Sequence, residues 1–133
     1  IGSGQLDFFN ELLGKRIELA KNYLQLISQI IPEMRIPATT DKGVHSYQSF
    51  CVFTYNRDEI ILKMRQVGIE TQIGTYSLAL QPAFQTIPSY QIVSSKNSKT
   101  IFNKVLTLPL YHELTFEEQT NIIKQLAGLI NEN

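Results

Sequence analysis

Apolar residues recur every three or four positions near the start of the chain. The stripe consists of Leu6, Phe9, Leu13, Ile17, Ala20, Leu24, Ile27 and Ile31. This spacing predicts one amphipathic helix over residues 6–31, which Pro32 and Pro37 bring to an end. Such a helix is roughly 39 Å long at 1.5 Å per residue, which is longer than a small domain is wide. We therefore expect part of it to contact a surface outside a small domain.

The pattern changes twice over the next stretch of sequence. Residues 46–55 are apolar on both alternating faces, which predicts a buried, central strand. Asn56 with Glu59 three positions on, followed by an apolar stripe that stops at Gly68, predicts a short helix with a side-chain N-cap. Residues 69–73 alternate between apolar and polar and predict a second strand.

The rest of the chain adds one strand and two helices. Residues 74–94 are irregular, and a brief helix is expected at residues 95–103, before a third strand at residues 105–108. Thr115 and Glu118 have the spacing of a capping box and predict the start of a last helix.

These elements together predict an α+β fold. It is a small antiparallel sheet of about three strands, covered by helices and preceded by one long helix. We expect a single small domain over residues 1–133, with a connecting helix at 1–31 and the α+β body at 46–133.

Charge and composition exclude several classes of partner. The chain has 133 residues, with 12 Lys plus Arg against 12 Asp plus Glu, and no basic run. Nucleic acid and membrane are therefore not expected as partners. The uncharged stretch at residues 71–95 is too rich in Gln, Pro, Ser and Thr for a membrane helix. The first residues lack the features of a targeting peptide and resemble a cut end. We expect a cytoplasmic protein.

The residues that usually carry chemistry do not form a recognisable constellation. Cys51 is the one cysteine, and His45 and His112 lie far apart, so neither a disulfide nor a metal site is expected. Cys51 lies in a predicted strand and is expected to be a buried, inert thiol. Both histidines are expected at the surface, and no phosphate-binding or nucleophile motif occurs. The residues alone predict no complete catalytic site.

The uncharged segment is the most informative part for function. It interleaves hydrogen-bonding residues such as Thr75, Tyr76 and Gln81 with apolar ones such as Leu78 and Leu80. Such a mixture suits a loop that packs on another protein or lines a pocket for a polar, uncharged ligand group. An ordinary solvated loop has a similar composition, so both interpretations stay open at this point.

Several motifs in fixed order resemble the C-terminal part of the DegT/StrS family of sugar aminotransferases. They are GQL at residues 4–6, RIELAKNY at 16–23, SYQSFCV at 46–52, RD at 57–58, GIETQIGTY at 68–76, LQPAF at 80–84, LTLPLY at 106–111 and LTFEE at 114–118. The first two are similar to the helix that joins the family's large domain to its small one. The resemblance covers nearly the whole chain.

The resemblance implies a function for a longer enzyme rather than for this chain alone. It implies a pyridoxal phosphate enzyme of the aspartate-aminotransferase fold, a homodimer that transfers an amino group from a donor to a nucleotide-linked keto sugar. In the family, the Schiff-base lysine and the cofactor-binding residues belong to the large domain. We therefore expect this chain to be the small domain, with no cofactor and no activity of its own.

Two positions depart from the family's pattern. Many members carry histidines near the sugar where this chain has Gly74 and Ala79. The resemblance then leaves Thr75, Tyr76 and Gln81 as the expected substrate-binding residues, and no catalytic, cofactor or metal residue. A different hypothesis, from another class of protein, is a free-standing α+β binding or dimerisation module without catalysis.

Overall fold

A computed structural model describes residue 4 and residues 6–39, 42–86 and 95–131 of the chain. Its helices and strands confirm the predicted α+β class, with one long helix ahead of a three-stranded antiparallel sheet. In chain order the elements are α2 (Phe9–Ile30), β1 (Phe50–Phe53), α3 (Arg57–Gln66), β2 (Gln72–Ile73), η1 (Leu78–Leu80), α4 (Pro82–Gln85), α5 (Lys96–Lys104), β3 (Val105–Leu108) and α6 (Phe116–Asn131).

The sheet has the strand order β1-β3-β2, so β3 is its central strand. The prediction of a long central strand at residues 46–55 was therefore wrong: β1 has four residues and lies at an edge. Tyr47 adopts a left-handed backbone, with φ of 46°, which interrupts the extended run before β1. On its outer edge β1 meets the chain that follows α2, where the Phe53 amide donates to the Arg35 carbonyl at 2.9 Å.

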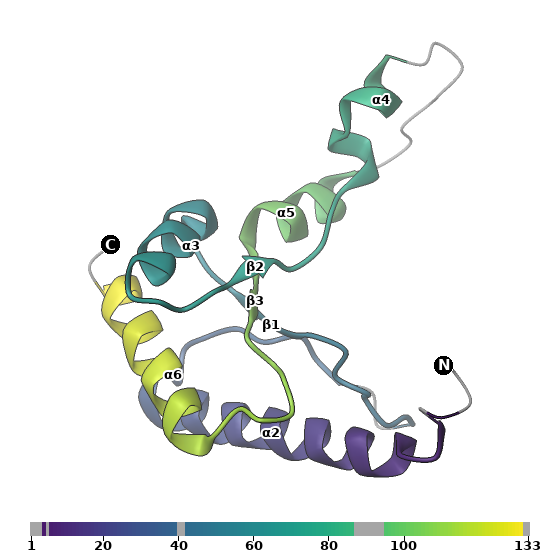
Figure 1. Cartoon of the computed structure of the whole chain (residues 1–133). Helices are drawn as coiled ribbons and strands as arrows, with labels where there is room; N and C mark the ends of the chain where they lie inside the picture. Colours follow the sequence, from purple (N-terminus) through teal and green to yellow (C-terminus); the bar gives the residue numbers. More distant parts are fainter. Residues whose placement is uncertain (1–3, 5, 40–41, 87–94, 132–133) are drawn as a thin grey trace.

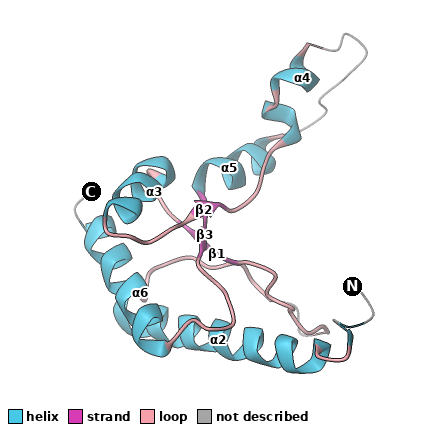
Figure 2. Cartoon of the chain, in the orientation of Figure 1, coloured by secondary structure: helices cyan, strands magenta, loops and turns pink. Residues whose placement is uncertain are grey.

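One face of the sheet carries the hydrophobic core. Phe50 and Val52 of β1 pair with Leu108 and Leu106 of β3, and all four side chains are buried. Figure 2 shows the sheet nearly edge-on, with α3 and α6 on one side of it and α2 beneath. The core therefore lies between the sheet and these three helices, as the alternation of a half-exposed sheet requires.

The long helix α2 divides into two halves. The C-terminal half supplies core residues, namely Leu19, Ala20, Tyr23, Leu26 and Ile27. In the N-terminal half, by contrast, Phe9 and Leu12 are exposed. The N-terminal half therefore extends past the core of this chain, and its contact with a surface outside the domain stays a prediction. None of the helices in the described residues is long and apolar enough to cross a membrane.

A buried polar group lies where α2 packs against α6. The Gln119 side chain is fully buried, donates to the Leu19 carbonyl at 2.9 Å and accepts from the Asn22 amide at 3.2 Å. Next to it, the Tyr23 hydroxyl donates to the Pro109 carbonyl at 2.8 Å. The two bonds of Gln119 fix how α2 and α6 lie against each other, since a shift along the contact would leave buried polar atoms without partners. The Tyr23 bond joins α2 to the chain that follows β3.

The two predicted N-caps have different outcomes. The capping box of α6 is confirmed: the Thr115 amide donates to the Glu118 carboxylate at 2.8 Å, and the Glu118 amide donates to the Thr115 hydroxyl at 3.2 Å. The bonds from Thr115 hold the pKa of Glu118 below its usual range. Asn56 does precede α3, but its side chain makes no capping bond because its backbone is left-handed, with φ of 53°.

The segment between β2 and β3 projects from the body of the molecule. Figure 1 shows η1, α4 and α5 extending away from the sheet, with α4 farthest from it. The sequence predicted an irregular stretch at residues 74–94, whereas its described part contains η1 and α4. Residues 87–94 lie outside the described residues. The brief helix predicted at residues 95–103 is α5, which leads directly into β3.

Candidate functional site

The loop that leaves β2, at residues 74–77, is attached to α5 and β3 at three points. The Gly74 amide donates to the Val105 carbonyl at 2.9 Å. The Tyr76 ring lies 6.1 Å from the Phe102 ring, between centroids. The third point is a hydrogen bond of 2.7 Å from the Ser98 hydroxyl to that of Ser77, whose side chain is buried. The loop therefore has a defined position although it lies at the surface.

The three residues expected to bind substrate lie on this loop and just beyond it. Thr75 and Tyr76 are exposed, and Tyr76 has 69% of its surface accessible. Gln81 is half-buried, and its side-chain amide donates to the Ser77 carbonyl at 3.3 Å. The structure thus presents Thr75 and Tyr76 together to the outside, while the Gln81 amide is partly used within the loop.

Position 74 requires a glycine for a steric reason. A Cβ atom added there would overlap Cγ1 of Val105 and would lie 2.9 Å from Cβ of Val105. Val105 is buried at the start of the central strand, so it has little room to move. Gly74 is consequently a point of close approach between the loop and β3, and a larger side chain requires a different packing of Val105.

Sequence reasoning missed the burial of Arg57, which contacts Phe102, the residue of α5 against which the Tyr76 ring lies. Its side chain is 3% exposed, donates to the Phe102 carbonyl at 2.6 Å and lies over the Phe102 ring. A signal was available in the sequence. Arg57 is the first residue of α3, and a cation at a helix N-terminus is unfavourable unless another structure holds it.

A separate pocket lies between α2 and the chain that leads into β1. It has a volume of about 530 Å³, and it is lined by Leu24 together with residues 36–39 and 45–51. Cys51 faces it and is half-buried, not buried as predicted, because its side chain lies on the face of the sheet opposite the core. Its sulfur lies 3.5 Å from the Thr107 hydroxyl. None of the expected substrate residues lines this pocket.

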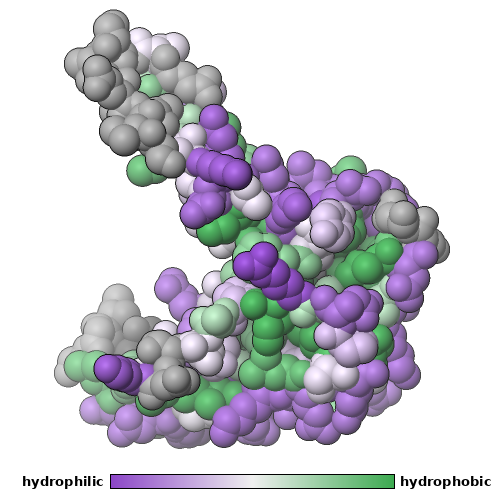
Figure 3. Space-filling model, turned by 180° about the vertical axis from the view of Figure 1, so that it is seen from behind, coloured by the Kyte–Doolittle hydropathy of each residue, from purple (hydrophilic) through white to green (hydrophobic). Residues whose placement is uncertain are grey.

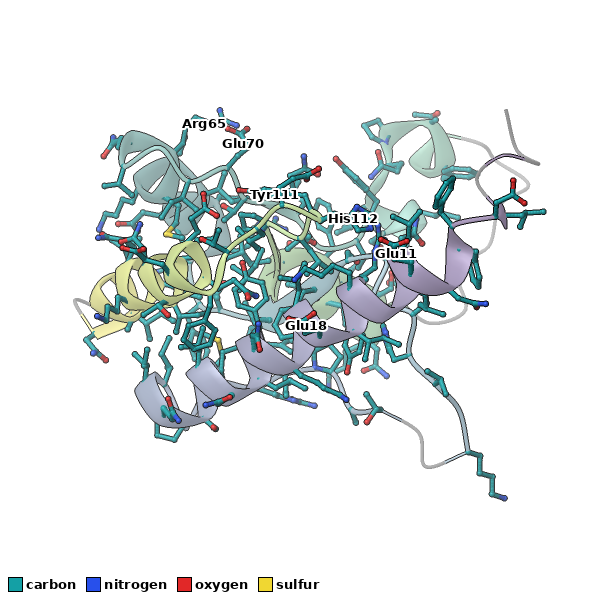
Figure 4. The ribbon with its side chains drawn as sticks, turned by 60° about the horizontal axis from the view of Figure 1, so that its bottom comes forward. Glu11, Glu18, Arg65, Glu70, Tyr111 and His112 are labelled. Atoms are coloured by element: carbon teal, nitrogen blue, oxygen red, sulfur yellow. The ribbon has the colours of Figure 1, made fainter. Side chains whose placement is uncertain are left out.

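The two histidines occupy different surroundings. His45 is exposed as predicted, and its Nδ1 atom accepts from the Tyr47 amide at 2.8 Å. His112 is half-buried, and its Nε2 atom is buried with no hydrogen-bond partner among the described residues. Figure 4 shows His112 beside α2, near Glu11. The described residues contain no cluster of three or more His, Cys, Asp or Glu side chains able to hold a metal ion.

The surface is notched between the projecting segment and the N-terminal part of α2. Figure 3 shows this hollow in the space-filling view, with apolar side chains exposed below it. Leu6, Phe8 and Phe9 are more than half exposed at that end of α2. Exposed apolar surface of this kind marks contact regions in soluble proteins.

The fold and the sequence agree with one family of proteins. The model of the DegT/DnrJ/EryC1/StrS aminotransferase family matches residues 1–127. The structure is similar to the aminotransferase TlmJ from Streptoalloteichus hindustanus, with a TM-score of 0.82 and 25% identity over 99% of this chain and 35% of that one. It is also similar to the sugar aminotransferase Spr1654 from Streptococcus pneumoniae, with a TM-score of 0.84 and 21% identity over 98% of this chain and 34% of that one.

The chain belongs to the DegT/DnrJ/EryC1/StrS aminotransferase family, and its fold matches about a third of the aminotransferase TlmJ. A curated relative, the pleiotropic regulatory protein of Geobacillus stearothermophilus, is 24% identical over 115 residues, which are 85% of this chain and 31% of that protein. The chain therefore spans about a third of the length of the relatives it matches.

Proposed function

We propose that this chain is the C-terminal small domain of a pyridoxal-phosphate-dependent aminotransferase that acts on nucleotide-linked keto sugars. The enzyme would serve the biosynthesis of amino sugars for cell-surface polysaccharides or antibiotics, and this domain alone would be inactive. In this proposal residues 1–31 connect to a large domain and residues 46–133 form the small domain. Family membership and coverage of a third of each relative support the proposal.

The observation that carries the proposal is the exposed pair Thr75 and Tyr76 on a loop of fixed position. Three contacts hold this loop, so its hydroxyl groups are placed without a large loss of conformational entropy on binding. A keto sugar presents hydroxyl and carbonyl groups that such side chains can bind by hydrogen bonds. Gln81 would contribute the part of its amide that the loop does not use.

The cofactor would be held elsewhere in the longer enzyme. Spr1654 is also described in a PLP-form. A Schiff-base lysine needs desolvation or a neighbouring cation. Every lysine of this chain lies among the described residues, and none of them is buried. Within this chain no lysine has the burial that desolvation requires, and the proposal assigns the residues present to substrate and domain contacts.

The altered positions 74 and 79 bear on which sugar is bound. Gly74 and Ala79 lack the imidazole groups that the family resemblance places near the sugar. The remaining hydrogen-bonding groups on this loop are neutral hydroxyl and amide groups. We propose that they bind an uncharged part of the nucleotide-linked substrate, with the amino donor bound by the rest of the enzyme.

The same proposal includes a cytoplasmic homodimer. The exposed apolar end of α2 supports a protein contact, since Leu6, Phe8, Phe9 and Leu12 are uncovered in this chain. That observation equally favours the second candidate function, a free-standing binding or dimerisation module without catalysis. The two candidates differ in whether the polypeptide that carries this chain also carries a cofactor-binding domain.

The cofactor distinguishes the two candidates. We expect the isolated chain to show no absorbance band of a borohydride-reducible aldimine when pyridoxal phosphate is added. We expect the polypeptide encoded by the complete gene to show that band and to transaminate a nucleotide-linked keto sugar. A complete gene product that contains no more than this chain, and binds no cofactor, would favour the module.

A further inference from the structure

The end of α5 is held by residues that lie outside it. The last carbonyl groups of a helix have no partners within the helix and need donors from elsewhere. The Thr54 amide donates to the Lys104 carbonyl at 2.8 Å. Arg57 donates through Nη1 to the Phe102 carbonyl at 2.6 Å and, at 3.5 Å, to the Val105 carbonyl.

Arg57 combines three kinds of contact that a planar guanidinium can make at once. Besides the two carbonyl groups, its Nε atom donates to the Asp58 carboxylate at 2.6 Å. Its Cζ atom lies 5.3 Å from the centre of the Phe102 ring, within the range of a cation–π contact. A buried cation needs such partners, and these fix Phe102 from both its backbone and its ring.

Phe102 connects the buried Arg57 to the exposed Tyr76, because its ring contacts both side chains. The centre of its ring lies 6.1 Å from that of Tyr76, within the range of aromatic pairs, and the two rings are tilted by 41°. Figure 1 shows that α5 is the part of the projecting segment nearest the sheet, so a shift of its last turn also moves the loop packed on it. Arg57 itself is buried and has no access to a ligand outside.

We propose that Arg57 is a positioning residue for Tyr76: it fixes the last turn of α5 and the Phe102 ring, and that ring orients Tyr76. The consequence for catalysis rests on the proposed function, in which Tyr76 contacts the keto sugar. The orientation of Tyr76 itself is a property of this chain, and it is measurable without substrate.

The structural test is nuclear Overhauser contact between the rings of Tyr76 and Phe102 in the 133-residue chain. We expect the contact in the wild type, its loss in Arg57→Met, and its retention in Arg65→Met. Arg65 is the matched control because it lies in the same helix with an exposed ion pair to Glu70, seen in Figure 4. Ring contact that persists in a folded Arg57→Met chain would overturn the proposal.

A second variant covers the case in which Arg57→Met does not fold. Arg57→Lys keeps the charge, but an ammonium group cannot bond two carbonyl groups and also place a planar face on the ring. The same loss of ring contact is expected in this variant. Persistence of the contact in Arg57→Lys, with Arg57→Met unfolded, would count against positioning and in favour of a purely stabilising role.

The functional test uses the full-length enzyme and the variants Phe102→Leu and Phe102→Tyr. We expect Phe102→Leu to raise KM for the keto sugar by about tenfold with little change in kcat, and Phe102→Tyr, which keeps a ring, to restore KM. If KM is unchanged in Phe102→Leu while Tyr76→Ala raises KM, the proposal that the Phe102 ring orients Tyr76 is overturned. If Arg57→Met loses the ring contact but KM is unchanged in both Phe102→Leu and Tyr76→Ala, the positioning role of Arg57 is upheld and the proposed role of Tyr76 is refuted.

Discussion

The side chain of Val105 fills the space in which a side chain at position 74 would lie. The contact joins the first residue of β3 to the loop that leaves β2, where the Gly74 amide also donates to the Val105 carbonyl. The backbone hydrogen bond and the steric limit on the side chain at position 74 therefore occur at the same place, where the loop passes close to β3. The loop that carries Thr75 and Tyr76 begins directly after it, so this contact sets where the candidate site starts.

Replacing Gly74 tests this close approach. Gly74→Ala is expected to destabilise the chain by about 1–3 kcal/mol, because the added methyl group overpacks a region with no room. Adding Val105→Ala makes room for the methyl group, so the two substitutions should be less costly together than their sum. Urea denaturation of the single and double variants measures this coupling.

Gly128→Ala is the matched control for that measurement. Gly128 lies in α6, and a Cβ atom there meets nothing within 4 Å. The substitution should be neutral or stabilise by up to ~1 kcal/mol, since alanine favours a helix more than glycine does. Equal effects of Gly74→Ala and Gly128→Ala would show that position 74 is not sterically limited.

The buried Tyr23 makes stability depend on alkaline pH. Burial is the main cause that raises the pKa of Tyr23 well above its usual range, with smaller contributions from Tyr111 and Glu118. A tyrosine in the unfolded chain ionises near pH 10, whereas Tyr23 in the folded chain stays protonated there. The contribution of Tyr23 is therefore fully present below about pH 10 and is lost progressively as the pH rises above it.

The variant Tyr23→Phe separates this effect from other titrations. Near pH 7 it should be less stable than the wild type by about 1 kcal/mol, because the bond to the Pro109 carbonyl is lost. Above pH 10 the difference should shrink or reverse, as measured by urea denaturation across pH 7–11.5. Tyr55→Phe, at an exposed ring, is the control and should follow the wild type. Parallel wild-type and Tyr23→Phe curves above pH 10 would refute the argument from burial.

The exposed end of α2 should make the isolated chain self-associate. At about 100 μM a contact with Kd of 1 μM is nearly saturated, so sedimentation should show dimers or larger species. Phe9→Glu, which places a charge on the exposed apolar surface, should restore the monomer. Leu62→Glu, at an exposed position on α3, should leave association unchanged. A wild-type chain that is strictly monomeric at this concentration would contradict the expectation.

Local patterns in the sequence predicted the elements whose signals lie within a few residues. The limits of β3 and the capping box of Thr115 and Glu118 are of this kind, because each depends on adjacent residues. The apolar stripe likewise predicted the long helix α2, whose C-terminal half is buried. The same local reasoning placed Thr75 and Tyr76 in an irregular segment, the structure shows that they are exposed, and their role toward substrate stays a prediction.

Contacts between distant residues set the features that the sequence did not predict. The edge position of β1 follows from the strand order β1-β3-β2, and the apolar pattern of residues 46–55 does not encode that order. The glycine at position 74 depends on Val105, and the burial of Arg57 depends on α5. Neither partner is near in sequence, so no local pattern could indicate the contact of Gly74 with Val105. The position of Arg57 at the start of α3 indicated only that another part of the structure must hold it, not that this part is α5.

The most direct test of the proposed function is the steady-state kinetics of the full-length enzyme with Tyr76→Ala, measured together with its melting temperature. Tyr76 is exposed, so its removal should leave the melting temperature nearly unchanged. If the loop contacts the substrate, kcat/KM for the nucleotide-linked keto sugar should fall by about tenfold or more, as for a loss of about 1.4 kcal/mol of transition-state stabilisation. An unchanged kcat/KM with an unchanged melting temperature would remove Tyr76, and this loop, from the substrate site.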